Sequence, residues 1–106
     1  MDNSNSQIIQ ETQYNNHIDV LKNYDILKKT NSSPPVMTLF EKTKIIGLRS
    51  QQIANGAPIL VEIDKYIDNI IDIAEYELKQ KKTPFILKRK VNNTYEYWKI
   101  EDLIIN

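Results

Sequence analysis

The chain has 106 residues, a length that suits one small domain. Its 14 basic residues balance its 14 acidic residues, and this formal net charge of zero argues against a strongly basic nucleic-acid binder and against an acidic tail. The chain has no Cys, which excludes disulfides and thiolate metal sites. No run reaches the roughly 20 apolar residues of a membrane span, and the N-terminus lacks the basic-then-apolar order of a signal peptide, so we expect a soluble intracellular protein.

Residues 1–36 form a polar segment rich in Asn, Gln and Ser, which we interpret as a low-complexity N-terminal arm before a folded domain at 37–106. We expect this arm to be mostly disordered, or ordered only by a partner. Within it, Val20, Tyr24 and Leu27 share one helix face, which indicates either a short helix or a chance pattern in an Asn-rich tail. The run "NSSPP" is expected to be a stiff hinge, because proline disfavours helix in the residue before it.

The folded part is predicted to begin with a helix over 39–55. Thr38 and Glu41 have the spacing of a capping box, in which each residue bonds the backbone N–H of the other. Gly56 is a typical helix end, and Pro58 prevents continuation. The apolar face of this helix is expected to contain three residues at seven-residue spacing, Leu39, Ile46 and Ile53.

A short extended run is expected at 59–63, followed by a second helix that Asp68 caps. This second helix should end before Thr83 and Pro84, because proline cannot continue it. Residues at helical spacing mark its expected apolar face: Ile67, Ile71, Ala74 and Leu78.

Two β-prone runs, 85–91 and 95–100, flank the sequence Asn92-Asn93-Thr94. Asn tolerates the left-handed backbone that a tight turn requires, so the pattern predicts a β-hairpin. The last six residues can form one helical turn or an edge segment. The expected fold class is therefore α+β, with two main helices plus a C-terminal β-hairpin and a disordered or partner-ordered N-terminal arm.

Residue types that perform chemistry are sparse. The single histidine, His17, lies in the polar arm, where a solvated side chain is the expected role. Asp64, Asp68 and Asp72 lie four residues apart, a spacing that could hold a hard cation, but we expect the acidic residues of the second helix, Glu77 included, to lie on a solvated face. We therefore expect no catalytic, cofactor or metal site.

One basic cluster is present, and it could contact a nucleic-acid backbone, with Trp98, Tyr95 and Tyr97 as a stacking platform. Acidic residues balance this cluster over the domain, and cations are favoured at a helix C-terminus for other reasons. A small nucleic-acid-binding module is therefore kept as the alternative function. The cluster consists of Lys79, Lys81, Lys82, Lys88, Arg89 and Lys90.

Gly47 lies in the middle of the best-predicted helix, where it costs about 1 kcal/mol relative to Ala. Such a cost is offset if another segment must approach the backbone closely. One account is a narrow crossing point with the second helix. The other is a polar-rimmed surface for another protein chain, with Arg49 and Gln52 beside it. The residues by themselves favour neither account.

The stretch "MTLFEKTKIIGLRSQQIANGAPILVEI" resembles the omega-type small subunit of multisubunit DNA-directed RNA polymerases, in particular its eukaryotic and archaeal form, which includes archaeal subunit K. The family pattern is Thr-x-x-Glu, then Gly-x-Arg-Ala-x-Gln-Ile, then Ala-Pro before an aliphatic run. The resemblance covers about residues 37–105, and its later part is carried by Ile73-Ala74, Glu77-Leu78, Thr83-Pro84, Trp98 and Leu103-Ile104.

The chain departs from this pattern at several points. Ser50 stands where Ala is usual, a change that keeps the position narrow. The entry to the second helix, "DNIIDIA", lacks the usual proline. The arm is not densely acidic as in some eukaryotic members, so the docking of transcription factors through such arms does not carry over to this chain.

The resemblance implies a non-catalytic subunit that clamps the largest polymerase subunit and promotes assembly and stability of the enzyme. It implies no cofactor, no membrane or small-molecule partner, and contact with nucleic acid only through the complex. The expected location is the nucleus for a cellular protein, or the virion and cytoplasmic viral factory for a viral one, since an Asn-, Ile- and Lys-rich composition is typical of AT-rich genomes and relatives occur in large DNA viruses. The implied partner interface comprises Thr38, Glu41, Gly47, Arg49, Ser50, Gln52, Ile53, Ala57 and Pro58.

Overall fold

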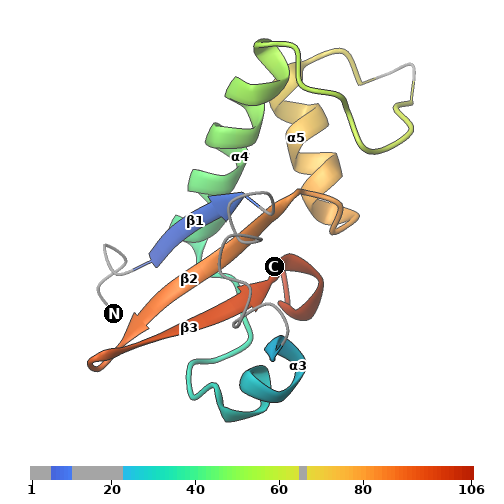
Figure 1. Ribbon diagram of the computed structural model, residues 1–106. Helices are drawn as coiled ribbons and strands as arrows, with labels where there is room; N and C mark the ends of the chain where they lie inside the picture. Colours follow the sequence, from blue (N-terminus) through green and yellow to red (C-terminus); the bar gives the residue numbers. More distant parts are fainter. Residues whose placement is uncertain (1–5, 11–22, 65–66) are drawn as a thin grey trace.

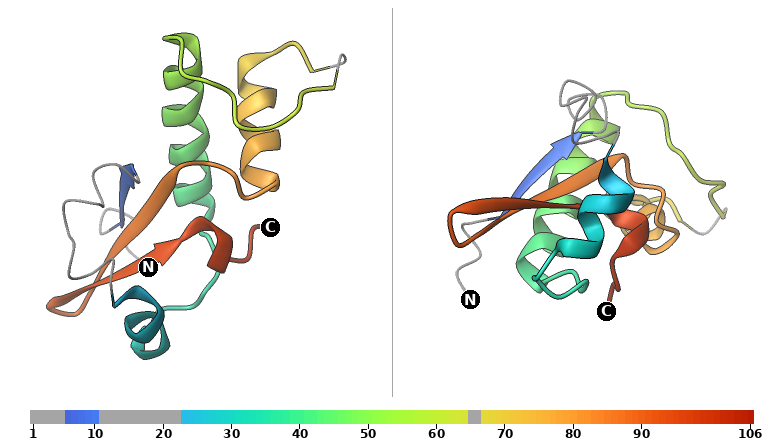
Figure 2. Two further views of the ribbon diagram at one scale, coloured as in Figure 1. Left: turned by 45° about the vertical axis from the view of Figure 1, so that its right-hand side comes forward. Right: turned by 60° about the horizontal axis from the view of Figure 1, so that its bottom comes forward.

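The structure is a computed structural model that describes residues 6–10, 23–64 and 67–106. A three-stranded antiparallel sheet is combined with two main helices that lie side by side and extend beyond one end of the sheet (Figures 1 and 2). The predicted α+β fold class is confirmed. In chain order the elements are β1 (Ser6–Gln10), α3 (Tyr24–Leu27), the 3-10 turn η2 (Lys28–Thr30), α4 (Leu39–Ala54), α5 (Ile70–Lys79), β2 (Phe85–Val91), β3 (Thr94–Lys99) and the 3-10 turn η3 (Ile100–Asp102).

Helix α4 begins and ends where its sequence predicts. The Glu41 N–H donates to Thr38 Oγ1 at 3.1 Å, and the Thr38 N–H donates to Glu41 Oε1 at 2.9 Å, so both halves of the capping box are present. After the C-cap residue Asn55, the backbone of Gly56 turns left-handed, with φ +99°. Glycine adopts this angle without the strain that a Cβ atom would bring, so the helix stops there.

The buried face of α4 differs from the predicted one. Leu39 is 79% exposed, and Ile46 and Ile53 are only half-buried. The fully buried line runs instead through Glu41, Ile45 and Arg49, which are spaced four residues apart. The pattern of apolar residues could not find this face because two of its three members are charged and have their partners inside the fold.

Helix α5 begins one residue later than predicted, since Asn69 and not Asp68 is its cap, and the Asn69 side chain accepts from the Ile71 N–H at 2.8 Å. Its C-terminus precedes Thr83 as expected, with Lys81 in the left-handed region at φ 58°. Of the predicted apolar face, Ala74 and Leu78 are buried, Ile67 is half-buried and Ile71 is 53% exposed.

The run at 59–63 forms no strand and lies in the loop between α4 and α5. Extended backbone becomes a strand only when a neighbouring strand accepts its hydrogen bonds, and no strand of the described sheet pairs with this run. Ile59, Leu60 and Ile63 consequently keep between 37% and 46% of their surface exposed.

The C-terminal hairpin is confirmed. Strands β2 and β3 pair antiparallel with Leu87 opposite Trp98, and the turn between them is Asn92-Asn93, with Asn92 in the left-handed region at φ 56°. The chain then forms the 3-10 turn η3 and a parallel bridge from Val36 to Ile104, so both alternatives for the last residues are realised.

Part of the N-terminal arm is ordered on this sheet, contrary to the expectation of a mostly disordered segment. Strand β1 pairs antiparallel with β2, with Ile8 opposite Leu87, and adds a third strand to the hairpin. Tyr24 of α3 is 3% exposed; its hydroxyl donates to Asp102 Oδ2 at 2.6 Å and accepts from the Lys99 N–H at 2.9 Å. His17 and Val20 lie outside the described residues.

The hydrophobic core lies between the sheet and the two main helices. Among the described residues, no helix is long and apolar enough to cross a bilayer. The core consists of Met37, Ile45, Leu78, Phe85, Leu87, Trp98, Ile100 and Leu103, with Ile8, Ile46 and Ile105 packed against it.

Candidate partner interface on helix α4

Arg49 is the centre of a hydrogen-bond network that joins α4, α5 and the loop between them. Its guanidinium forms a bidentate ion pair with Glu77 through Nε and Nη2, and Nη2 also donates to the Pro58 carbonyl at 2.7 Å. Gln52 Oε1 accepts from Arg49 Nη1 at 3.1 Å, and Glu77 Oε2 accepts from the Leu60 N–H at 3.2 Å. Arg49, which the resemblance assigns to the partner interface, therefore makes its bidentate contact with a carboxylate within the chain.

Glu77 is fully buried, so its predicted position on a solvated face is wrong. The exposed carboxylates of α5 are Asp72 and Glu75. Helical spacing alone could not place Glu77 on the buried face of α5, because Leu78 next to it is buried as well. The cation that neutralises Glu77 lies 28 residues away in the sequence.

A second buried ion pair joins α4 to the sheet. Arg89 Nε donates to Glu41 Oε2 at 2.9 Å and Arg89 Nη2 donates to Glu41 Oε1 at 2.8 Å. Arg89 also donates to the carbonyls of Pro34 and Val36, at 2.7 and 2.8 Å. Glu41 in turn accepts from the Ser6 hydroxyl of β1 at 2.6 Å. One carboxylate thus caps α4 and connects both ends of the arm to the domain.

The pKa of Glu41 lies below its ordinary value. Burial by itself would raise this pKa, because it disfavours the charged carboxylate. Hydrogen bonds from Arg89, Ser6 and the Thr38 backbone, together with the charge of Arg89, outweigh that effect and favour the ionised form. The capping box is therefore held in its charged, fully hydrogen-bonded state.

Sequence reasoning missed a third network, in which "NSSPP" binds the hairpin and is not simply a hinge. Glu96 accepts from the backbone N–H and hydroxyl of both Ser32 and Ser33, at 2.6 to 3.0 Å. Burial would raise the pKa of Glu96, but these serine donors lower it below its ordinary value. Trp98 Nε1 donates to Ser33 Oγ at 3.0 Å. The alternation of strand β3 could have indicated that Glu96 and Trp98 share one face.

Gly47 is exposed, and within the described parts of the chain no atom outside its own helix turn lies within 4 Å of the position that a Cβ would occupy. The packing account, a narrow crossing with the second helix, is therefore wrong for this structure. Gly47 and Arg49 are two residues apart, or about 200° around the helix, so Gly47 points away from α5. Nothing in the described fold requires a glycine here.

An exposed surface surrounds Gly47 along α4. Phe40 is 43% exposed and Leu48 is 38% exposed, so α4 presents two large apolar side chains beside the glycine. We call this surface the α4 face, and it comprises Phe40, Lys44, Gly47, Leu48 and Gln51. Its polar side chains, Lys44 and Gln51, are exposed as well.

The residues of the implied interface fall into two groups. Glu41, Arg49 and Gln52 form hydrogen bonds within the chain, as do Thr38 and the Pro58 carbonyl. Gly47 is exposed, whereas Ser50, Ile53 and Ala57 are half-buried. The Ser50 Oγ has no hydrogen-bond partner within the described parts of the chain. The first group fixes the shape of α4 and its following loop, and the second group is available to contact another chain.

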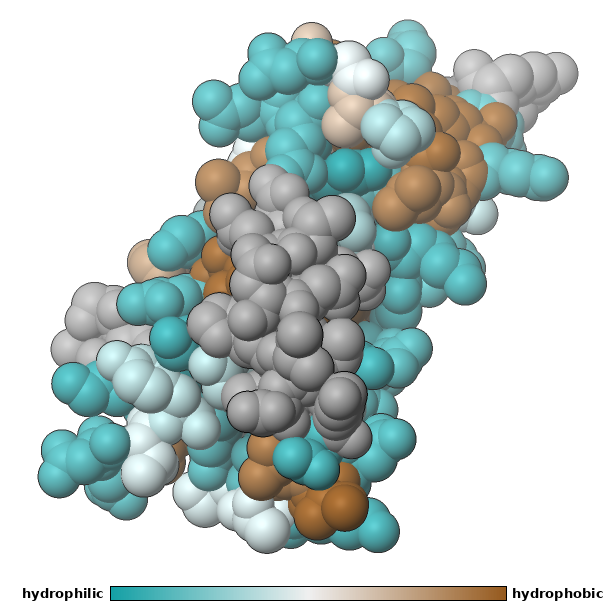
Figure 3. Space-filling view, viewed as in Figure 1, coloured by the Kyte–Doolittle hydropathy of each residue, from teal (hydrophilic) through white to brown (hydrophobic). Residues whose placement is uncertain are grey.

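A second exposed apolar surface lies over the α4–α5 loop and the start of α5, visible as the brown area at the upper right of Figure 3. It contains Ile59, Leu60, Ile63, Ile70 and Ile71, each at least 37% exposed. Clustered apolar side chains of this kind are typical of protein interaction sites.

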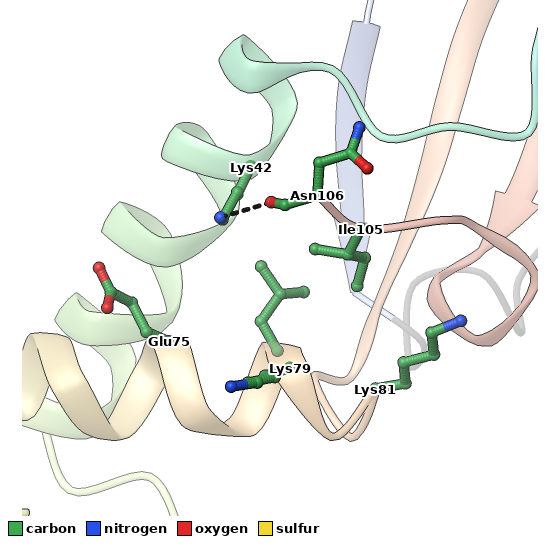
Figure 4. A pocket seen from close by; sticks show the side chains of 7 residues that line it. Lys42, Glu75, Lys79, Lys81, Ile105 and Asn106 are labelled. Carbon is green, nitrogen blue, oxygen red and sulfur yellow. Dashed lines mark hydrogen bonds between the residues drawn. The ribbon is translucent and has the colours of Figure 1, made fainter.

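The basic cluster is divided by the fold. Arg89 is 6% exposed and paired with Glu41, and Trp98 is 7% exposed in the core, so neither can contact nucleic acid from its observed position. Lys79 and Lys81 lie beside Lys42 around a cavity of about 390 Å3 between α4, α5 and the C-terminal residues (Figure 4). The Lys42 ammonium donates to the Asn106 O atom at 2.8 Å. Among the described residues, no three metal-ligating side chains come together.

The chain was compared with known proteins. No protein-family model matches it. It is 41% identical over 70 residues to the "Probable DNA-directed RNA polymerases I, II, and III subunit RPABC2" of Caenorhabditis briggsae, an alignment that covers 65% of this chain and 50% of that protein. It is 34% identical over 87 residues to the "DNA-directed RNA polymerases I, II, and III subunit RPABC2" of Saccharomyces cerevisiae, covering 81% of this chain and 56% of that protein.

The "DNA-directed RNA polymerases II and V subunit 6B" of Arabidopsis thaliana is 34% identical over 80 residues, which cover 74% of this chain and 55% of that protein. The chain spans about half the length of the curated relatives it matches. The resemblance predicted from the sequence motifs is confirmed by these matches, and over its aligned part the chain is similar to the DNA-directed RNA polymerase subunit named RPABC2.

Proposed function

We propose that the chain is a non-catalytic subunit of a DNA-directed RNA polymerase, and that it binds the largest subunit and promotes assembly and stability of the enzyme. The observation that carries this proposal is the identity of 34% to 41% with polymerase subunits over most of the chain. The location would follow that of the polymerase: the nucleus for a cellular protein, or the virion and cytoplasmic factory for a viral one.

The α4 face supports this proposal physically. A glycine that its own fold does not need lies beside two exposed apolar side chains, Phe40 and Leu48. A partner segment crossing at Gly47 could approach the helix backbone closely and bury both side chains, which would recover the free energy that glycine costs the isolated helix. A small domain also gains apparent stability from any partner that binds only its folded state.

Purification from the native source tests the proposal. The tagged full chain is isolated under native conditions, and the proteins that accompany it are identified by mass spectrometry. We expect the largest polymerase subunit in roughly equal molar amount. If the chain is recovered folded and the largest subunit is absent, the polymerase proposal fails.

A matched pair of variants tests the α4 face in the same purification. Gly47→Leu places a bulky side chain on the α4 face, whereas Glu75→Leu places the same side chain on an exposed position of α5. We expect G47L to lose the largest subunit and E75L to retain it. Equal retention by both variants would remove the α4 face from the interface.

A further inference from the structure

One face of the β2–β3 hairpin combines lysines and tyrosines. In the antiparallel register Lys88 lies opposite Tyr97 and Lys90 lies opposite Tyr95, so these four side chains share one face of the sheet. Leu87 alternates with them and belongs to the core, so this face is the one that points away from α4. We call it the hairpin face: Lys88, Lys90, Tyr95, Tyr97 and, further along β3, Lys99.

Lysine and tyrosine side chains are in direct contact here. The Lys88 ammonium lies 4.2 Å from the ring centroid of Tyr95 and 6.0 Å from that of Tyr97. Tyr95 keeps 50% of its surface exposed, and Lys90 beside it is exposed. Lys99 lies 4.9 Å from the ring of Tyr24. A cation held against one side of an aromatic ring fixes the orientation of that ring at modest cost in entropy.

The charges of the sheet are unbalanced on this face. Glu96 is the one acidic residue within the three strands, and it points to the opposite face, where Ser32 and Ser33 bind it. Lys28, which lies near Tyr24, is paired with Asp25 and Asp102. The hairpin face therefore presents lysines without a carboxylate of its own strands, although the whole chain has no net charge.

A cavity of about 310 Å3 adjoins the hairpin face at β3, the edge strand of the sheet. Its lining consists of Tyr24, Leu27, Thr30, Asn31, Thr94, Tyr95, Glu96 and Tyr97, and the Glu96 carboxylate is bound by Ser32 and Ser33. The cavity thus combines aromatic and aliphatic carbon with an amide and with strand backbone, the groups that accommodate a planar, polar-edged ring.

From these features we propose that the hairpin face binds single-stranded nucleic acid. Lys88, Lys90 and Lys99 contact successive phosphates, and a base stacks on the exposed part of Tyr95 beside the cavity. Stacking of this kind tolerates any base, so the contact is weak in sequence preference. The site keeps Lys88, Lys90, Tyr95 and Tyr97 from the cluster and stacking platform that the sequence indicated. It excludes Arg89 and Trp98, which are buried on the other face. The inference does not depend on the polymerase proposal.

Fluorescence anisotropy with labelled oligonucleotides tests the site, with the full chain and strands of about 15 nucleotides, oligo-dT and oligo-U, each also as a duplex. We expect both single strands to bind more tightly than their duplexes. Y95A should weaken binding by about fivefold or more, since stacking on one aromatic side chain contributes about 1–3 kcal/mol, and Y95F should bind like the wild type. The emission of buried Trp98 verifies that each variant is folded.

Salt dependence provides a second measurement. The double variant K88A/K90A should reduce the slope of log Kd against log salt by about 1.4, because each phosphate contact on a single strand contributes about 0.7. The matched control is K79A/K82A, which removes two exposed lysines at and just after the C-terminus of α5 and should leave the slope unchanged.

Three outcomes would overturn the proposal. In the first, Y95A binds like the wild type, so that the ring makes no contact. In the second, K79A/K82A lowers the salt slope as much as K88A/K90A, so that binding is diffuse. In the third, an acidic peptide competes fully with the oligonucleotide, and the affinity for the peptide is reduced by K88A/K90A but not by Y95A. That result would assign the lysines to a protein partner.

Discussion

Arg49 of α4 and Glu77 of α5 form a bidentate ion pair in which the Glu77 side chain is closed to solvent and the Arg49 side chain is 4% exposed. The same two groups bind the backbone of the α4–α5 loop, at the Pro58 carbonyl and the Leu60 N–H. A buried pair of this kind adds little net stability over well-packed apolar side chains, but removing one partner leaves an uncompensated charge in the interior. The pair therefore fixes how α4, the loop and α5 are arranged.

We predict that Arg49→Ala lowers the free energy of unfolding by about 3–5 kcal/mol, because Glu77 is left buried and unpaired. The double variant R49M/E77L, which replaces both charges with apolar groups, should recover most of that loss. Urea unfolding followed by Trp98 fluorescence measures both. Gln51→Ala, at an exposed position of the same helix, should stay within about 0.5 kcal/mol of the wild type. A double variant no more stable than R49A would show that packing, and not charge, is the reason for the loss.

The lowered pKa of Glu41 predicts how stability depends on pH. Its ordinary value is 4.5, and in the folded chain the carboxyl titrates below that. As the pH falls, the unfolded chain takes up the proton first, so the stabilisation is complete above the ordinary pKa and is lost as the pH falls through the folded pKa. Glu96 changes stability in the same direction, because its pKa is lowered as well.

We therefore expect the urea midpoint of the wild type to fall steeply below about pH 5, and that of Glu41→Gln to fall less over the same range from a lower starting value. Glu75→Gln, an exposed position on α5, should keep the wild-type slope. A wild-type slope in E41Q would mean that Glu41 does not titrate below its ordinary range.

Local signals in the sequence predicted the elements well, and contacts between distant residues explain what they missed. The Thr38–Glu41 box, the Gly56 stop and the Asn92 turn each depend on neighbours within four residues, and all three are present. The buried faces of α4 and α5 were predicted only in part, because Arg49 and Glu77 neutralise each other across 28 positions. Only the folded chain brings such partners together.

The ordered conformation of the described parts of the arm also results from contacts between residues that are distant in the sequence. A polar, Asn-rich composition indicates disorder when the segment has no partner, but here polar groups of the arm form hydrogen bonds with partners that lie more than 60 residues away. The motif resemblance predicted which residues of α4 belong to the interface. It could not predict which of them form hydrogen bonds within the chain and which are exposed to solvent. The sequence grouped Tyr95 and Tyr97 with Trp98 as a stacking platform, whereas strand alternation places Trp98 on the opposite face of β3 from the two tyrosines.

Ser33 provides a test of how the arm binds. Its hydroxyl donates to Glu96, accepts from Trp98 Nε1 and lies 3.3 Å from an Arg89 nitrogen, whereas the Ser32 hydroxyl contacts Glu96 alone. Ser33→Ala should therefore cost about 1–3 kcal/mol, since it leaves buried polar groups unsatisfied, and it should change the emission of Trp98. Ser32→Ala is the matched control and should cost less. Equal effects of the two variants on stability and emission would contradict the observed docking of the arm.

Variants of Gly47 distinguish a role of this glycine in folding from a role in binding a partner. Because no described residue beyond its own helix turn lies near the position of a Cβ, Gly47→Ala should stabilise the isolated chain by about 0.5–1 kcal/mol, the usual gain in a helix interior. Gly47→Leu should likewise fold at least as stably as the wild type. In native purification, however, the larger side chain should reduce recovery of the largest polymerase subunit. Thermal unfolding of the free chain and the molar ratio in the purified complex measure the two effects separately. If G47L destabilises the isolated chain as much as it impairs assembly, the glycine serves the fold of the chain and not a partner.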